Sequence, residues 1–377
     1  MRLLHTADWH LGRTLHGASL LDAQLTSIGA IAEIAADEGA DAILLAGDVF
    51  DRALPPRDVV ELWDEAMTRL AEICPLVVIS GNHDSAVRLG VGARLLDRSG
   101  VHIRVDPAGC GAPVVIGDCC VYPIPYLEPD LVRDFLGAVS RGHEAVLAAA
   151  MDRVRADLAG RPARTRSVVV AHAFVTGAET APSERDLSVG GSASVPGSVF
   201  AGVDHVALGH LHGPQKVAGI GRYAGSPLAF SFAERHQKKS VSLIELDGSG
   251  THTRTIELPV PRPLATLTGT LDELLTDAEN TVHEGSWVSA VLTDAVHPLD
   301  AMARLQSRFP HALHLEHRPE GAAPTPAGAF SERIAGVADI DLLLGFVEDM
   351  RGAPAADDEA ELLDLALSAA RSREVAA

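Results

Sequence analysis

The chain has 377 residues, of which 47% are hydrophobic and 22% charged, so wholesale disorder is excluded and two or three domains are expected. The chain has 31 basic and 51 acidic residues. Its formal net charge of −20 argues against unaided nucleic-acid binding through a basic surface. No apolar run approaches the roughly 18 residues of a membrane span, and Asp8 interrupts the segment where a signal peptide needs its apolar core. Four cysteines are too few for a disulfide scaffold, so we expect a cytoplasmic protein.

The first 259 residues alternate short apolar runs with amphipathic segments, a pattern that favours a layered α/β fold. We predict helices over Leu20–Asp37, Arg57–Ile73 and His143–Leu158. The predicted strands are Arg2–Ala7, Ala42–Ala46, Leu76–Ser80, Val114–Val121, Val168–Ala171, His205–Leu208, Tyr223–Phe232, Ser240–Leu246 and Thr251–Leu258. The last three complete a second sheet, and Cys119 and Cys120 should be small buried residues of a strand.

A proline-rich hinge, Leu258–Pro263, marks the first domain boundary, because proline interrupts helices and central strands. Residues 260–319 then form a small α/β domain, in the order strand Leu264–Leu271, helix Asp272–Glu279, strand Trp287–Thr293, helix Pro298–Phe309 and strand His311–His317. Residues 320–377 are a linker and a helical tail. Ser331–Ala377 contains 11 acidic and 4 basic residues, a net charge of −7. Helices this short must pack on their own domain, on a second copy or on a partner.

Five polar motifs follow predicted strands. They are Asp8-Trp9-His10, Gly47-Asp48-Val49-Phe50-Asp51, Gly81-Asn82-His83-Asp84, Ala171-His172-Ala173 and Gly209-His210-Leu211-His212. Each one alone has an ordinary structural explanation, such as a capping aspartate or a surface histidine, but their joint occurrence at strand ends predicts one shared crevice. The candidate ligands are Asp8, His10, Asp48, Asn82, His172, His210 and His212, with Asp48 placed to bridge two cations. A mixed N/O donor set favours Mn²⁺, Fe²⁺ or Zn²⁺ over Mg²⁺.

In these motifs the chain resembles the calcineurin-like metallophosphoesterase superfamily, whose pattern is D-x-H, G-D-x-x-D/H, G-N-H-D/E, H and G-H-x-H. More narrowly it resembles the SbcD nuclease subunits, through residues 4–12, 47–51, 183–191 and 223–227. The resemblance implies two mixed sheets flanked by helices, with a small α/β capping domain and a helical tail. It assigns one metal to Asp8, His10, Asp48 and His212, and the other to Asp48, Asn82, His172 and His210. His83 would be the catalytic imidazole, oriented by Asp84, and the role of Asp51 stays open because relatives often have histidine there.

The same resemblance implies a Mn²⁺-dependent DNA nuclease that acts in repair, recombination and replication. Its activities would be 3′-to-5′ exonuclease on duplex ends and endonuclease at hairpins and single strands. The implied partner is the SbcC ATPase, in an assembly with two copies of each subunit, and its surface could carry DNA in place of this acidic chain. A homodimer is also expected. In such a site His83 would protonate the leaving alkoxide.

Six residues near the motifs are candidate substrate contacts, and each also has an ordinary loop or packing explanation. They are Trp9, which could stack on a base, and Arg13, Arg52, Arg88, Arg185 and Ser226, which could contact phosphate. Two other functions fit the metal motifs: a phosphodiesterase for cyclic nucleotides or other small phosphoesters, and a non-catalytic scaffold for a partner. The intact ligand set argues against the scaffold, and the additional domain and tail argue against a minimal small-molecule hydrolase.

Overall fold

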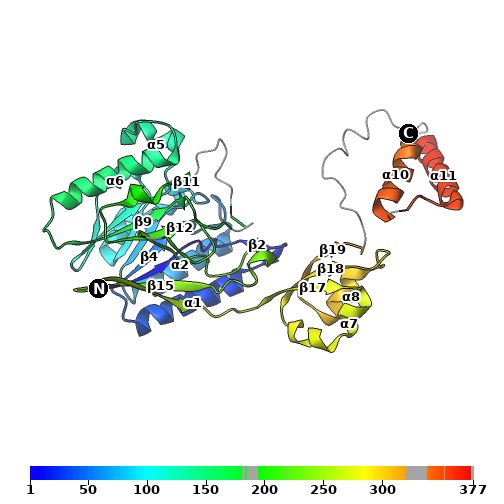
Figure 1. Cartoon of the computed structure of the whole chain (residues 1–377), viewed down its shortest axis with the longest axis horizontal. Helices are drawn as coiled ribbons and strands as arrows, with labels where there is room; N and C mark the ends of the chain where they lie inside the picture. The colour runs from blue at the N-terminus through cyan, green and yellow to red at the C-terminus, as the bar shows by residue number, and fades with distance from the viewer. Residues whose placement is uncertain (181–182, 185–193, 218, 320–337, 352, 375–377) are drawn as a thin grey trace. The chain divides into compact units, whose positions relative to one another are not determined.

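The computed structural model describes the chain except residues 181–182, 185–193, 218, 320–337, 352 and 375–377 (Figure 1). The chain divides into two compact units, Met1–Pro263 and Leu264–Ala377. Among the described residues, every helix is too short or too polar to cross a lipid bilayer.

The first unit is built on two six-stranded sheets. One has the strand order β16-β15-β1-β4-β5-β6, in which β1, β4, β5 and β6 run parallel and β15 and β16 complete an antiparallel edge. The strands are β1 (Arg2–Thr6), β4 (Ala42–Ala46), β5 (Leu76–Ile79), β6 (Val101–Arg104), β15 (Ser240–Asp247) and β16 (Gly250–Glu257).

The other sheet has the order β13-β14-β12-β9-β8-β7, with β14, β12, β9 and β8 parallel. Its strands are β7 (Val114–Ile116), β8 (Cys119–Ile124), β9 (Arg166–His172), β12 (His205–Gly209), β13 (Gln215–Val217) and β14 (Gly221–Tyr223). Short elements lie around the sheets: β2 (Thr14–Leu15), β3 (Ala18–Ser19), β10 (Phe174–Val175), β11 (Ser194–Val195), α3 (Ala86–Leu89) and α4 (Ala93–Leu96).

The two sheets pack face to face, and helices cover their outer faces (Figure 1). Helices α1 (Leu21–Asp37) and α2 (Arg57–Ala71) pack on the first sheet, and α5 (Pro129–Leu136) and α6 (His143–Ala159) pack on the second. Central strands are therefore covered on both sides, which explains why all five residues of β4 are apolar and buried. The structure confirms the layered α/β fold.

Two predicted strands have different bounds in the structure. The predicted strand Val114–Val121 is a hairpin of β7 and β8, because Gly117 has the positive φ of 55° that a tight turn requires. The predicted strand Tyr223–Phe232 is wrong beyond Tyr223, where Gly225, with a φ of 77°, turns the chain into a loop. The prediction that Ser240–Leu246 and Thr251–Leu258 complete a second sheet is wrong, because they are β15 and β16 and extend the first sheet beside β1. Strand β6 and helix α5 are additional to the predicted elements. Cys119 and Cys120 are buried and free, as expected.

The second unit contains a parallel three-stranded sheet, β17-β18-β19, and two helices that pack on it. The elements are β17 (Leu264–Gly269), α7 (Leu271–Thr276), β18 (Trp287–Leu292), α8 (Ala301–Arg308) and β19 (Ala312–His317). Thr270 and Glu273 form a reciprocal capping box that fixes the start of α7. After residues 320–337, α10 (Asp339–Arg351) and α11 (Asp357–Glu374) form a helical pair. The boundary between this pair and the small domain stays a prediction.

Candidate metal centre

All five polar motifs lie at the carboxyl ends of parallel strands. Asp8 and His10 follow β1, Asp48 follows β4, Asn82 and His83 follow β5, His172 ends β9, and His210 and His212 follow β12. Asp8, His10 and Asp48 have positive φ values of 54°, 43° and 49°, a conformation that non-glycine residues seldom adopt and that is concentrated at functional sites. Gly47 must be glycine, because a Cβ there would lie 2.5 Å from His172 Nδ1.

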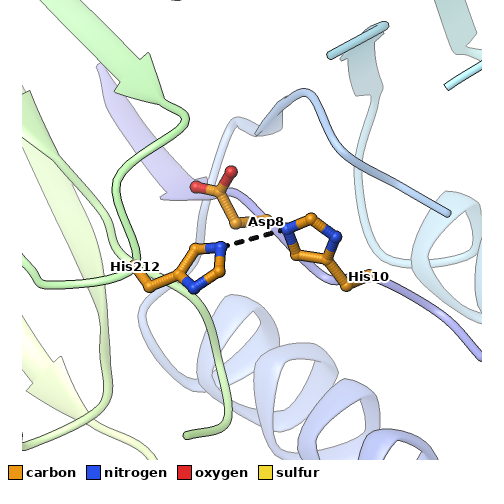
Figure 2. A group of neighbouring side chains, drawn as sticks. All are labelled: Asp8, His10 and His212. Carbon is orange, nitrogen blue, oxygen red and sulfur yellow. Dashed lines mark hydrogen bonds between the residues drawn. The ribbon is translucent and has the colours of Figure 1, made fainter. Parts of the chain in front are cut away.

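One half of the site joins the loops after β1, β4 and β12. His10 Nε2 lies 3.1 Å from His212 Nε2, with the Asp8 carboxylate beside them (Figure 2). His10 Nε2 is also 3.5 Å from Asp48 Oδ2. Asp8 is held in place from the second sheet, because it accepts hydrogen bonds of 2.9 and 3.1 Å from the backbone N–H of His210. Asp8, His10 and His212 therefore offer ligand atoms that all lie within 4.8 Å of one another, and Asp48 adjoins this group through His10.

The other half centres on His172. Its Nδ1–H donates to the carbonyl of Ala46 at 2.9 Å, which fixes the ring. Burial lowers the pKa of His172 to about 3, so the ring is neutral and its Nε2 carries a lone pair. That Nε2 lies 2.9 Å from Asn82 Oδ1 and 3.5 Å from Asp48 Oδ2. Three electron-pair donors thus converge on one point, and a histidine that donates its other N–H to a carbonyl is the usual arrangement of a metal ligand.

The charges of the site point to cations as the missing component. Asp8 and Asp48 are 0% and 2% exposed, and within the described part of the chain no lysine or arginine pairs with either. Burial raises the pKa of both carboxyl groups, and the charge of Asp48 adds to the effect on Asp8. Burial lowers the pKa of His10, His210 and His212, which keeps these imidazoles in the neutral form that binds metals. The donor set therefore fits divalent metal ions.

His212 is supported by residues outside the five metal motifs. Its Nδ1 lies 2.7 Å from Ser183 Oγ, which in turn hydrogen-bonds Glu234, and its backbone N–H donates to Glu184 at 2.6 Å. Lys239 donates to Glu234 at 2.6 Å and to the carbonyl of His212 at 3.0 Å. On the opposite side, Gln24 of α1 donates to the carbonyl of His10 at 2.7 Å. Ser183 and Glu184 belong to the segment 183–191 that carries the SbcD resemblance, whereas Gln24, Glu234 and Lys239 lie in no motif, so no local pattern could reveal these three.

His83 lies at the half-buried edge of the site, with its ring 4.7 Å from that of His10. Its backbone N–H donates to Asp48 at 2.8 Å, and its Nδ1 lies 2.9 Å from the carbonyl of Asp51. The carbonyl therefore holds the proton on Nδ1 and leaves Nε2 for chemistry. The expectation that Asp84 orients His83 is wrong. Asp84 instead accepts hydrogen bonds from the backbone N–H groups of Val49, Phe50 and Gly81, at 2.9 to 3.1 Å, and fastens the loops after β4 and β5 together.

Residues 1–214 match the calcineurin-like phosphoesterase family. The chain belongs to this family. Residues 260–350 match the Type 5 capsule protein repressor C-terminal domain. The chain is 31% identical over 324 residues to the SbcD component of the SbcCD nuclease from Staphylococcus saprophyticus, covering 84% of this chain and 85% of the relative, which supports an SbcD-type phosphoesterase. The family implies that the site of this phosphoesterase holds divalent metals.

Two solved structures are also similar to the phosphoesterase. TT1561 of Thermus thermophilus has a TM-score of 0.40 at 16% identity, over 67% of this chain and 98% of that one. A dimetal phosphatase from Danio rerio has a TM-score of 0.39 at 13% identity, over 69% and 99%.

Beside the metal centre of the phosphoesterase, Asp51 and Arg13 form a charged edge. The Asp51 carboxylate lies 3.5 Å from Arg13 Nη1 and 3.7 Å from His10 Nδ1. The Arg13 guanidinium lies 4.9 Å above the ring of Phe230, which itself packs against His10 and His212. Asp51 thus neutralises Arg13 on one side and contributes its backbone carbonyl to His83 on the other.

The predicted substrate contacts divide into core and surface residues. Trp9 is 1% exposed and donates from Nε1 to Thr6, so the stacking expectation is wrong: its ring faces are covered by the core. Ser226 is fully buried and hydrogen-bonds Lys239 and the carbonyl of Leu228, which excludes the predicted phosphate contact. Arg52, on the loop after Asp51, and Arg88, in the short helix α3, are both exposed. Arg185 lies outside the described residues.

Proposed function

We propose that the protein is a DNA nuclease that hydrolyses phosphodiester bonds with two divalent cations, most effectively Mn²⁺. The observation that carries the proposal is the convergence of buried carboxylates, an amide oxygen and neutral imidazoles on two adjacent points, with His83 at the edge. Asp8, His10, Asp48 and His212 would hold one cation. Asp48, Asn82, His172 and His210 would hold the other.

When bound, such cations neutralise charge on the phosphoryl oxygens and acidify a water molecule for attack. The protein supplies the rest. Gln24 of α1 holds the backbone of His10 and the carbonyl of Ala46 holds the ring of His172, so these ligands are positioned before substrate arrives. His83, with its proton on Nδ1 fixed by Asp51, presents Nε2 to the leaving oxygen. A protonated His83 there would donate to the departing alkoxide, a contribution of about 10²–10⁴-fold.

DNA as the substrate rests on the SbcD-type relative and on the additional C-terminal domain, which a small-molecule hydrolase does not need. The proposed activities are 3′-to-5′ exonuclease on duplex ends and endonuclease at hairpins and single strands, in DNA repair and recombination in the cytoplasm. That relative is one component of a nuclease named SbcCD. We therefore place this chain in a complex of two copies with two copies of an SbcC ATPase.

The helices α10 and α11 are the candidate docking element for SbcC. Phe346, Leu362 and Leu365 are 54%, 66% and 68% exposed, an apolar surface that a partner helix could cover. A partner with a basic groove would also explain how a chain of net charge −20 acts on DNA.

The test is Mn²⁺-dependent hydrolysis of a labelled blunt duplex, compared with bis-p-nitrophenyl phosphate, with and without SbcC. We expect duplex degradation that requires Mn²⁺ and His83 and increases with SbcC. Turnover of the small diester without any action on DNA in either setting would instead identify a phosphodiesterase. Binding of SbcC without hydrolysis of either substrate would identify a scaffold.

A further inference from the structure

A second polar cluster lies in the layer between the two sheets, at the end of the sandwich away from the metal centre. Most of this layer is apolar, with residues such as Leu3, Leu44 and Ala207. Four polar side chains interrupt it: His5 of β1, Ser242 of β15, His205 of β12 and Arg222 of β14, all at most 6% exposed. His205 starts β12 and His210 follows its end, so these two residues lie about 16 Å apart along the strand.

The strand register explains why these side chains meet. Every second residue of a strand lies on the same face, so His5 shares a face with the core residues Leu3 and Ala7. Ser242 of β15 is paired with His5 of β1 and lies on that face too. On the facing sheet, Arg222 is paired with Ala207, two residues from His205. All four therefore point into the layer between the sheets.

The cluster opens into a cavity of about 490 Å³, the size of a small-molecule site. Arg222 and His205 form its inner wall, and Lys216, Thr251 and Thr253 line it further out. Lys216 lies directly opposite Arg222 in the antiparallel β13–β14 pair. Lys216 is exposed, so the pair places two positive charges on one wall of the cavity, where an anion would be attracted to both.

Buried polar atoms in this cluster lack partners. Arg222 Nε, His205 Nε2 and Ser242 Oγ are inaccessible and make no hydrogen bond with the described residues. No described carboxylate forms an ion pair with Arg222, and burial lowers the pKa of its guanidinium. Among the described residues that line the cavity, the one acidic residue is Asp204, whose carboxylate already accepts hydrogen bonds from the backbone N–H and hydroxyl of Ser167. An unpaired buried cation is expensive and implies an anionic partner.

We propose that this cavity binds a small molecule through a phosphate group. A guanidinium binds two phosphate oxygens at once, Lys216 adds a second positive charge, and the hydroxyls of Thr251 and Thr253 can donate to the remaining oxygen. The volume beyond these groups accommodates a nucleoside. The site is independent of the proposed nuclease reaction, because no candidate metal ligand lines it.

The test uses the full chain in the presence of a chelator, because without metals the carboxylates of Asp8 and Asp48 repel phosphate from the metal centre. Calorimetry and the thermal unfolding midpoint are measured with inorganic phosphate and with adenosine monophosphate, at ionic strength held constant with sodium chloride. We expect saturable binding that raises the midpoint. Arg222→Met should weaken binding at least about tenfold, and the variant alone should unfold at the same temperature as the wild type or higher.

Arg57→Met is the matched control, because Arg57 is an exposed arginine on α2, and it should bind phosphate like the wild type. Should Arg222→Met fail to fold, Lys216→Met decides, since Lys216 is exposed and its replacement leaves the core intact. Absence of saturable binding, or equal binding by the wild type and the folded variant, would overturn the proposal and assign the polar cluster to ordered water. Unchanged affinity in Lys216→Met would also contradict it.

Discussion

Buried charges of opposite sign lie at two places along β12, and in the described part of the chain neither has a counter-ion. At the carboxyl end, Asp8 and Asp48 are buried among neutral imidazoles without a lysine or arginine partner in the described chain. Towards the amino end, Arg222 is buried beside Ala207 of β12 and opposite Lys216 of β13, and no described carboxylate pairs with it. The sign of the unpaired charge indicates the sign of the missing ligand, so the same sandwich offers a cation site at one end and an anion site at the other.

The largest expected effect is the loss of the bridging carboxylate. Asp48→Asn should reduce Mn²⁺-dependent hydrolysis by at least about 10³-fold, because both proposed cations share Asp48. In a chelator the variant should unfold at the wild-type temperature or above, since a buried unpaired charge has been removed. With Mn²⁺ added, the wild type should instead unfold at the higher temperature, because it binds the cations more tightly than the variant. Calorimetry and thermal unfolding check both points.

Asp152→Asn, an exposed change on α6, is the matched control and should leave both measurements unaltered. Retention of full Mn²⁺ binding by Asp48→Asn would contradict the assignment of the unpaired carboxylates to metals.

His83→Ala should lose about 10²–10⁴-fold in DNA hydrolysis while keeping both cations, because the ring serves the leaving group and not the metals. The loss should be much smaller with bis-p-nitrophenyl phosphate, whose leaving group departs without a proton. Steady-state rates on the two substrates, together with Mn²⁺ titration, separate these effects. His297→Ala, an exposed histidine of the second unit, is the control. Equal losses on both substrates with weakened Mn²⁺ binding would make His83 a ligand.

How far the sequence predicts this site depends on where each residue lies relative to a strand end. The ligands are predictable because parallel strands bring their carboxyl ends to one edge, so a polar residue directly after an apolar run is placed by topology alone. The orientation of a side chain within such a loop is not. Asp84 is adjacent to His83 in sequence, yet three backbone N–H groups draw its carboxylate the other way.

Residues that join distant loops are equally invisible in the sequence. Glu234 and Lys239 reach His212 only through the fold, from the short segment between the predicted strands Tyr223–Phe232 and Ser240–Leu246, which carries no motif. Trp9 and Ser226 lie beside motif residues, which suggests a role at the substrate, whereas the core encloses both.

The Glu234–Lys239 pair is the opposite case to the unpaired buried charges, because each of its two charges has the other as counter-ion. Glu234→Gln should lower stability by about 3–5 kcal/mol, since Lys239 is left buried and uncompensated. It should also weaken Mn²⁺ binding about 10–100-fold by releasing the support of His212. In the double variant Glu234→Gln, Lys239→Met, stability should recover but Mn²⁺ affinity should not. Glu257→Gln, whose pair with Lys238 is exposed, should change neither quantity.

Trp9→Phe is expected to have the smallest effect. Although Trp9 lies between two candidate ligands, its indole N–H is satisfied by Thr6 at 2.9 Å and its ring packs edge-on against Trp63 at 6.2 Å. Phenylalanine keeps most of that packing but leaves the buried Thr6 hydroxyl with one partner fewer, a cost of about 1–3 kcal/mol in unfolding free energy. Hydrolysis and DNA affinity should stay at the wild-type level. Weaker DNA binding at unchanged stability would show that the ring reaches substrate after all, and that a residue whose polar atom is already paired can still belong to the site.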